Sequence, residues 1–301
     1  MLIAYRRSEN GKMQETADMQ GADWVRVEKP SDEEIEKVAA TLSLDGSLLR
    51  DALDQYEAPR FEVEDGTPYI FLRYPFSTEP AGTTPLLIAI TGDVLVTFAR
   101  GTPSFLDKIA SQSHAAGKME ILIRIISEIT ARYSSGIINT QRSVNRRRHN
   151  VVDMSEQDIL ELTGDESTIS MFLDALVPQG NVLARLASGK AIDVREEDHD
   201  RFEDLALSTS QLIDLGRALI RTMENTRNAY AAISTQRLNH IIRILTALTV
   251  IVTLPNVIIG IYGMNVPLPL ADNPHAITII LLFTLIIVTV ITVLFKRNKW
   301  L

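Results

Sequence analysis

Two long apolar runs near the C-terminal end constrain the fold of this chain more than any other feature. They cover residues 244–261 and 276–295, and each is about 20 residues long. A helix of that length crosses the hydrocarbon core of a bilayer, which is about 30 Å thick. We therefore predict a multi-pass membrane protein whose C-terminal part forms two transmembrane helices joined by a short link.

The distribution of basic residues predicts how these two helices are oriented. The link, residues 262–275, contains neither Lys nor Arg. Five basic residues flank the apolar runs on their other sides: Arg237, Arg243, Lys296, Arg297 and Lys299. Because basic segments stay on the cytoplasmic side of a membrane, we expect both termini in the cytoplasm, the link outside, and an inner (plasma) membrane location.

The part of the chain before the apolar runs is acidic. The whole chain has a net charge of −8, and its first 240 residues carry 37 acidic and 26 basic side chains. This balance argues against nucleic-acid binding, which rests on basic patches, and favours attraction of cations. The chain has no cysteine, so disulfides and thiolate metal sites are excluded.

Residues 1–100 have the pattern of a small α/β domain. Ser31 and Glu34 form a capping box that predicts the start of a helix, and residues 46–56 predict a second one. Turn residues separate short apolar segments that are typical of strands. We expect strands at residues 1–7, 24–29, 60–64, 69–74, 86–91 and 94–99, arranged as a mixed sheet with helices packed against it.

From residue 103 onward the pattern becomes helical. Residues 119–152 predict one long helix, and Pro178 with Gly180 is expected to break residues 167–188 into two pieces. The basic cluster at residues 146–148 fits a lipid or nucleic-acid patch, but a solvated or inter-helix face is the favoured interpretation.

A further helix runs from about residue 194 without a proline until Pro255, so it is roughly 90 Å long. An apolar stripe along it calls for partner helices: Leu205, Leu212, Leu215, Leu219, Met223, Tyr230 and Ile233. A single helix that leaves the cytoplasm and becomes the first span explains both features. The predicted division is a cytoplasmic domain (1–190), this helix (191–262), a link (263–275), and the second span with a basic tail (276–301).

The first apolar run carries a regular polar stripe. Thr246, Thr249, Thr253, Asn256 and Gly260 follow each other at steps of 3, 4, 3 and 4, so they share one helical face. The stripe predicts a pore lining, although such residues also bond their own backbone or hold helices together. The threonines of the second run are irregularly spaced, and we interpret them as backbone-bonded or packing residues. Since one helix cannot enclose a water path, the stripe predicts a homo-oligomer.

The link begins with Tyr262-Gly263-Met264-Asn265. In this membrane context the tripeptide resembles the hallmark of the CorA family of divalent-cation transporters, which places Gly-Met-Asn after the first of two C-terminal spans. The resemblance implies a funnel-shaped homopentamer, with an α/β cytoplasmic domain and long helices, that conducts Mg²⁺ down its electrochemical gradient. Hydrated Co²⁺ or Ni²⁺ is expected to follow the same route.

The resemblance also implies roles for particular residues. Gly263, Met264 and Asn265 would form the outer ion filter, in which Asn265 offers an amide oxygen, Gly263 permits a tight turn and Met264 packs behind the ring. The pore would be lined farther in by Asn256, Thr253, Thr249, Thr246, Leu245, Ile242 and Asn239, with Leu245 and Ile242 forming a hydrophobic constriction. Regulatory Mg²⁺ would bind Asp204 and Glu79 between neighbouring subunits, unless both are ordinary surface acids.

One departure from the family pattern keeps two alternatives open. Residues 266–274 contain no glutamate, and Asp272 is their only acid, which leaves room for the related ZntB branch of zinc transporters, with proton coupling. Zn²⁺ prefers nitrogen and sulfur ligands, and His240 and His275 are expected to be interfacial, so ligand chemistry favours Mg²⁺. The other alternative is a non-conducting membrane scaffold or sensor.

No enzymatic activity is expected. The chain contains no Gly-x4-Gly-Lys-Ser/Thr phosphate loop, and no arrangement of a nucleophile or of paired carboxylates points to catalysis. We expect no covalent cofactor. Mg²⁺ is expected as substrate and as regulatory ligand, and the bilayer and further copies of the chain as partners.

Overall fold

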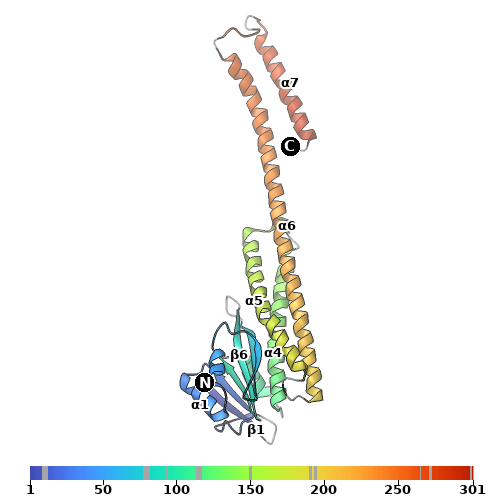
Figure 1. Cartoon of the computed structure of the whole chain (residues 1–301). Helices are drawn as coiled ribbons and strands as arrows, with labels where there is room; N and C mark the ends of the chain where they lie inside the picture. Colours follow the sequence, from blue (N-terminus) through green and yellow to red (C-terminus); the bar gives the residue numbers. More distant parts are fainter. Residues whose placement is uncertain are drawn as a thin grey trace. The chain divides into compact units, whose positions relative to one another are not determined.

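The computed structural model describes residues 1–8, 13–76, 82–92, 94–112, 117–148, 151–189, 192, 195–264, 266–270, 273–298 and 300. The chain divides into two compact units, Met1–Thr226 and Arg227–Leu301. The boundary falls inside one helix, α6 (Glu196–Tyr262), which is 67 residues long (Figure 1). The expected uninterrupted helix that enters the first apolar run is therefore confirmed.

The first unit is built on a seven-stranded mixed sheet. Its strands are β1 (Leu2–Arg7), β2 (Met13–Thr16), β3 (Trp24–Glu28), β4 (Arg60–Glu64), β5 (Thr67–Phe76), β6 (Gly82–Thr91) and β7 (Val94–Ala99). They lie in the order β2-β1-β3-β7-β6-β5-β4. Only β3 and β7 pair in parallel, with Val25 opposite Val96, and the other pairs are antiparallel.

Two short helices, α1 (Asp32–Leu42) and α2 (Gly46–Asp51), cover one face of the sheet. The capping box at the start of α1 is confirmed, because Ser31 Oγ accepts from the Glu34 N–H and Glu34 accepts from the Ser31 N–H. Side chains alternate along a strand, so each strand gives this face every second residue. The resulting core is fully apolar and includes Val25, Val27, Ile35, Val38, Leu49, Phe71, Leu87, Val96 and Phe98.

Three helices cover the opposite face: α3 (Ser104–Gln112), α4 (Lys118–Arg148) and α5 (Glu156–Ala187). Figure 1 shows α4 and α5 beside the sheet. Both helices bond to the backbone of Arg73 on β5. The hydroxyl of Tyr133 on α4 donates to the Arg73 carbonyl oxygen (3.1 Å), and the Arg73 N–H donates to Gln179 Oε1 on α5 (3.1 Å). The predicted mixed sheet with helices against it is thus confirmed.

The expected break at Pro178 is wrong, because α5 continues through it without interruption. Proline removes one backbone donor, but buried side chains anchor the helix on both sides of it, among them Leu176, Gln179 and Val182. Gly180 does not end the helix either. A Cβ added at this position would lie 3.4 Å from Ile213 Cδ1 on α6, which is an ordinary packing contact.

Two other expectations differ from the structure in the N-terminal domain. Strand β2 has no alternating pattern and exists through its pairing with β1, so it was not predicted. The helix expected over residues 46–56 ends at Asp51, and turns follow. Asp45 caps its start by accepting from the N–H groups of Ser47 (2.7 Å) and Leu48 (3.2 Å).

Ion pairs connect the long helices of the first unit. Arg147 on α4 pairs with Asp165 (2.6 Å) and Glu161 on α5, which confirms the inter-helix interpretation of the basic cluster at this residue. Arg201 near the start of α6 pairs with Glu120 on α4. The carboxylate of Glu120 also accepts from Arg124 Nε (2.6 Å).

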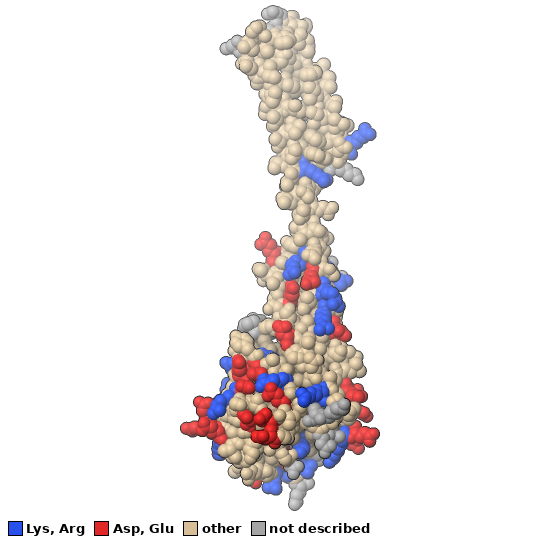
Figure 2. Space-filling view, in the orientation of Figure 1, with Lys and Arg blue, Asp and Glu red and all other residues tan. Residues whose placement is uncertain are grey.

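The second unit consists of the C-terminal part of α6 and of α7 (Ala276–Arg297). Both helices are long and apolar enough to cross a membrane, and almost none of either apolar segment is buried within the chain. Exposed side chains such as Ile259 (62%) and Ile277 (76%) would meet water in a soluble monomer. The face of the two apolar segments that Figure 2 shows is almost free of charged side chains, apart from a few basic ones.

Candidate ion pathway on the first transmembrane helix

The polar stripe lies on an exposed face of α6. All the predicted pore residues that belong to this helix are exposed within the single chain: Asn239, Ile242, Leu245, Thr246, Thr249, Thr253 and Asn256. With 3.6 residues per turn, these positions cluster on one side of the helix. The structure therefore leaves the stripe open to whatever lies next to the subunit.

A different face of α6 is covered within the unit. Ala247 is fully buried, and Val250, Ile251, Leu254 and Ile258 are half-buried. Helix α7 has a half-buried face at helical spacing, made of Ala276, Ile280, Thr284, Ile287, Val288, Ile291, Thr292 and Phe295. Figure 1 draws α7 alongside this part of α6. We infer that these two half-buried faces are turned toward each other, whereas the polar stripe is exposed.

Threonines on α6 and on α7 make the same type of hydrogen bond to the backbone of their own helix. On α6, Thr246 Oγ1 donates to the Ile242 carbonyl and Thr249 Oγ1 to the Leu245 carbonyl, each at 2.8 Å. On α7, Thr284, Thr289 and Thr292 donate in the same way four residues back. The backbone-bonded interpretation of these α7 threonines is confirmed. The same bond also occurs in the stripe, so it does not by itself mark a pore residue.

A proline interrupts the backbone ladder of α6 within the stripe. Pro255 has no N–H to donate to the Ile251 carbonyl, although the helix continues to Tyr262. The residue after the proline is the exposed Asn256, whose side chain carries two donors and an acceptor. The largest polar group of the stripe therefore lies where the helix has lost one of its own hydrogen bonds.

The link begins as a tight continuation of the helix end. The Gly263 N–H donates to the carbonyls of Ile259 (3.0 Å) and Gly260 (3.3 Å), and the Met264 N–H donates to that of Ile261 (3.2 Å). Gly263 does not have a positive φ, and an added Cβ would make only ordinary contacts. The backbone conformation at Gly263 is therefore one that other residues can also adopt.

The remaining filter residues are exposed or undescribed. Met264 is 58% exposed in the single chain. Asn265 and Asp272 lie outside the described residues. Tyr262, the last residue of α6, donates its hydroxyl hydrogen to the carbonyl of Pro269 in the link (3.3 Å). This bond holds the first half of the link against the end of α6.

The proposed regulatory acids are only partly described. Asp204 is exposed on α6 in the first unit, and Glu79 lies outside the described residues. Sequence reasoning did not single out His199 and Asp200, which lie one helical turn before Glu203 and Asp204. The side chains of His199, Asp200 and Glu203 bring one ligand atom each within 4.8 Å of one another. Their spacing of i, i+1 and i+4 on one helix was the available signal.

The two histidines near the membrane are both exposed. His240 lies on α6 just before the apolar run, and His275 precedes α7 without making a side-chain cap. In the described part of the chain, neither belongs to a group of three potential metal ligands. The described stripe itself offers hydroxyl and amide oxygens, which suit a hard cation better than Zn²⁺.

These features define an integral membrane protein with an α/β domain, a long helix that continues into the first span, and a second C-terminal span. The family model of the CorA-like Mg²⁺ transporter protein matches residues 19–297. The chain therefore belongs to the CorA-like Mg²⁺ transporter family.

Individual relatives agree with this assignment. The cobalt/magnesium transport protein CorA of Methanocaldococcus jannaschii is 28% identical over 287 residues, which cover 92% of this chain and 90% of the relative. The complete structure of the CorA magnesium transporter from the same organism has a TM-score of 0.89 at 24% identity, covering 100% of this chain and 99% of that one.

Two further structures share the fold at lower identity. The full-length CmaX protein has a TM-score of 0.79 at 18% identity and covers 99% of this chain and 98% of its own. The cytoplasmic domain of ZntB from Vibrio parahaemolyticus has a TM-score of 0.64 at 11% identity and covers 79% of this chain and 98% of its own. At these identities the likeness concerns the fold alone.

Proposed function

We propose that this protein is the subunit of a homopentameric channel-like transporter that moves Mg²⁺, and also Co²⁺, across the inner membrane into the cytoplasm. Family membership and the relative named as a cobalt/magnesium transport protein support this proposal. Both termini lie in the cytoplasm, in agreement with the basic residues that flank the spans.

The observation that carries the proposal is the exposed polar stripe of α6. The apolar face of α6 is the one that its own α7 covers, whereas Thr249, Thr253 and Asn256 remain exposed. Hydroxyl and amide groups that face lipid are costly, so the stripe needs water or further subunits. Copies of α6 arranged around an axis satisfy it and enclose an aqueous path.

The outer end of this path is formed by Gly263, Met264 and Asn265. Mg²⁺ sheds its water reluctantly, so a ring of Asn265 amide oxygens would bind the hydrated ion through its water molecules. The rings of Asn256, Thr253, Thr249 and Thr246 continue the path inward, and Leu245 and Ile242 form an apolar constriction before Asn239. Neutral rings hold the ion weakly enough for release.

The membrane potential supplies the driving force. A potential of 100 mV, negative inside, favours entry of a divalent cation by about 4.6 kcal/mol, at about 2.3 kcal/mol per charge. No covalent cofactor is needed for this scheme, and Mg²⁺ is the substrate.

Mg²⁺ inside the cell acts as the regulatory ligand. Asp204 is exposed on the soluble part of α6, and together with Glu79 of a neighbouring subunit it would bind the ion and hold the closed state. Replacing Asp204 by Asn should raise the internal Mg²⁺ concentration that inhibits flux in liposomes. Asp214→Asn, at an exposed aspartate on the same helix, is the control and should leave the inhibition curve unchanged.

Ion flux into liposomes that contain the purified protein tests the transport proposal directly. We expect Mg²⁺ and Co²⁺ uptake that follows the applied potential and is nearly abolished in Asn265→Ala. Thr253→Val should reduce the flux, whereas Thr289→Val on α7 is the matched control and should leave it unchanged. Absence of flux in the unmodified protein would favour a non-conducting scaffold or sensor instead.

The zinc-transporter alternative has one structural support, the fold likeness to the cytoplasmic domain of ZntB. The ligand types along the described stripe oppose it. The same liposomes separate the two functions when Zn²⁺ replaces Mg²⁺ with and without a pH gradient. Zn²⁺ uptake that exceeds Mg²⁺ uptake and requires the pH gradient would replace the magnesium proposal.

A further inference from the structure

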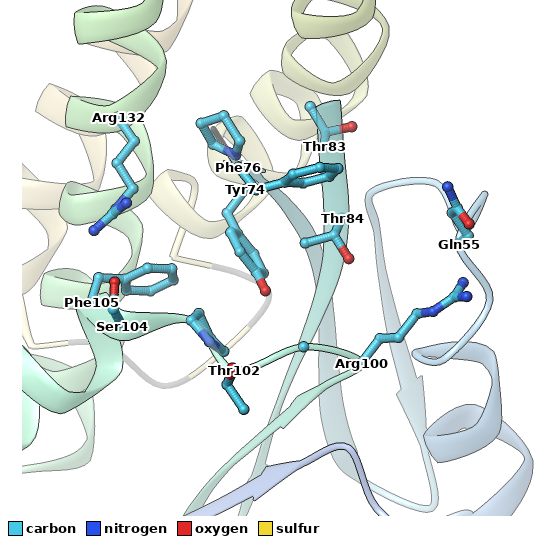
Figure 3. A pocket seen from close by; sticks show the side chains of 13 residues that line it. Gln55, Tyr74, Phe76, Thr83, Thr84, Arg100, Thr102, Ser104, Phe105 and Arg132 are labelled. Carbon is cyan, nitrogen blue, oxygen red and sulfur yellow. The ribbon is translucent and has the colours of Figure 1, made fainter. Parts of the chain in front are cut away.

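The first unit contains a pocket that the proposed ion pathway does not use. It has a volume of about 520 Å³ and lies where β5 ends, β6 begins and the chain leaves β7 for α3 (Figure 3). Residues of β5 and β6, of the segment that joins β7 to α3, of the start of α3, of the segment after α2 and of α4 form its wall. The size is within the range of about 300–1,000 Å³ that is typical of sites for small organic ligands.

A buried tyrosine points its hydroxyl group into this pocket. Tyr74 is only 5% exposed, and its hydroxyl has no hydrogen-bond partner among the described residues. Figure 3 shows its side chain directed into the cavity, between Arg132 on one side and Arg100 on the other. Burial raises the pKa of Tyr74 to about 12, so the hydroxyl is protonated at neutral pH and can donate. A ligand atom in the cavity can therefore accept from it.

The charge of the wall selects the type of ligand. Arg100 and Arg132 line the pocket, and its described lining includes neither Asp nor Glu. Arg100 is exposed and pairs with no carboxylate of the described residues. Arg132 lies over the Phe105 ring (5.0 Å to the centroid), and its Nε is 3.4 Å from Glu128 Oε1. One free and one partly neutralised guanidinium therefore face the same cavity, which favours an anion.

The start of α3 adds further donors to the same wall. Thr102, Pro103, Ser104 and Phe105 all line the pocket, and α3 begins at Ser104. The first N–H groups of a helix lack partners within it and attract negative charge. The hydroxyls of Thr102 and Ser104 lie on the same wall. Several donors from separate elements thus surround one space.

From this geometry we infer that the pocket binds a phosphate-bearing small molecule of nucleotide size. A phosphate chain offers enough oxygens to accept from Tyr74, from the arginines and from the start of α3 at once. A single carboxylate has only two oxygens. The inference does not depend on transport, because every residue that lines the pocket belongs to the first unit.

Calorimetric titration of the purified full-length protein in detergent tests this site. Magnesium-free buffer is needed so that the ligand keeps its full negative charge. The probes are ATP, tripolyphosphate and adenosine. We expect saturable binding of ATP and tripolyphosphate with one site per subunit, weakened by salt, and no binding of adenosine. Absence of binding by both phosphate compounds, or adenosine binding as tight as that of ATP, would overturn the inference.

Two variants connect the binding to this pocket. Tyr74→Phe and Arg100→Gln should each weaken ATP binding about tenfold, the loss expected for a hydrogen bond to a charged group. Tyr74→Phe should not lower the thermal unfolding midpoint, because the removed hydroxyl bonds to none of the residues that the structure describes. Unchanged ATP affinity in both variants would assign the binding elsewhere and refute the site.

A matched control lies on the same strand. Tyr69 is also buried, but it faces the opposite side of the sheet, and its hydroxyl accepts from the Asp45 N–H (2.8 Å). Tyr69→Phe should lower the unfolding midpoint and leave ATP binding unchanged. Equal weakening of binding by Tyr69→Phe and Tyr74→Phe would indicate a general loss of structure and would count against the proposed site.

Discussion

Arg26 is a charged residue in the interior of the sheet. It is 1% exposed, and its guanidinium pairs with Glu28 (2.5 Å) and with Asp107 (2.9 Å). The carboxylate of Glu28 is equally buried, whereas Asp107 is largely exposed. Hydrogen bonds to these acids keep the pKa of Arg26 raised against the opposing effect of burial. Glu28 is therefore the main buried counter-ion of Arg26.

At this residue scale, we predict that Glu28→Gln lowers the free energy of unfolding by about 3 kcal/mol, because it leaves a buried charge without its main counter-ion. The fluorescence of Trp24, which is fully buried beside Arg26, reports the transition in denaturant. Glu62→Gln removes a half-exposed partner of Arg60 and should cost less than about 1 kcal/mol. Equal costs for the two variants would contradict the prediction.

Helices α4 and α5 approach each other closely at a glycine. A Cβ added at Gly136 on α4 would lie 2.6 Å from Phe172 Cε2 on α5. The ring of Phe172 is buried and packs edge-on against Tyr133, with 5.3 Å between centroids. The ring therefore has little room to move, and the absence of a Cβ at Gly136 lets the two helices come this close.

At the scale of these elements, Gly136→Ala should destabilise the protein by about 1–3 kcal/mol through overpacking. Gly164→Ala is the opposite case, because nothing lies within 4 Å of its added Cβ. It should stabilise α5 by roughly 0.5–1 kcal/mol through helix propensity. Thermal unfolding followed by circular dichroism measures both changes. A higher midpoint for Gly136→Ala would show that the ring moves freely.

The contact between α4 and α6 is sensitive to acid. The hydrogen bond from Arg201, supported by one from Arg124, lowers the pKa of Glu120. A depressed folded-state pKa contributes stability that is complete above the unfolded value of about 4.5 and is lost as the pH falls through the folded value. We therefore expect the difference in unfolding midpoint between the unmodified protein and Glu120→Gln to shrink as the pH falls from 6 to 3.

Glu224→Gln is the control for this pH series. Glu224 is an exposed glutamate on the same helix as Arg201. Its effect on the midpoint should be small throughout the series. A Glu120→Gln difference that stays constant down to pH 3 would mean that the ion pair does not contribute to stability.

Local signals predicted most of these elements. The capping box of Ser31 and Glu34 and the turn residues around β7 depend only on neighbouring residues, and the structure confirms both elements. Strand β2 and the continuous α5 depend on contacts with other elements and not on their own local pattern. Pairing with β1 forms the first, and packing on both sides of Pro178 maintains the second. Propensity alone does not contain this information.

The candidate sites differ in the same way. The polar stripe of α6 is a periodic pattern on one helix, so its residues could be found from spacing, although their exposure away from α7 could not. The pocket around Tyr74 combines residues of two strands, two helices and the segments that follow α2 and β7. Arg100 and Arg132 are 32 positions apart in the chain and carry no shared motif. Only the fold brings them together.

At the scale of the whole molecule, the absence of cysteine in the sequence makes the predicted membrane orientation easy to test. Single cysteines can be placed at Asn273 in the link and at Asn298 after α7. A membrane-impermeant maleimide should label Asn273→Cys in intact cells and Asn298→Cys only after the membrane is opened. Labelling in the reverse order would place both termini outside and contradict the proposed direction of transport.

The hydrogen bonds of Thr246 and Thr249 have a further consequence for any ion that passes them. Each hydroxyl donates its only proton to the backbone of its own helix, so the oxygen faces outward with lone pairs alone. Water molecules around a cation turn their hydrogens outward and find acceptors there. Chloride, which needs donors, finds none at these two positions. In the proposed pore, a wall without formal charge would thus discriminate by the sign of the ion, through the direction in which its threonine protons point.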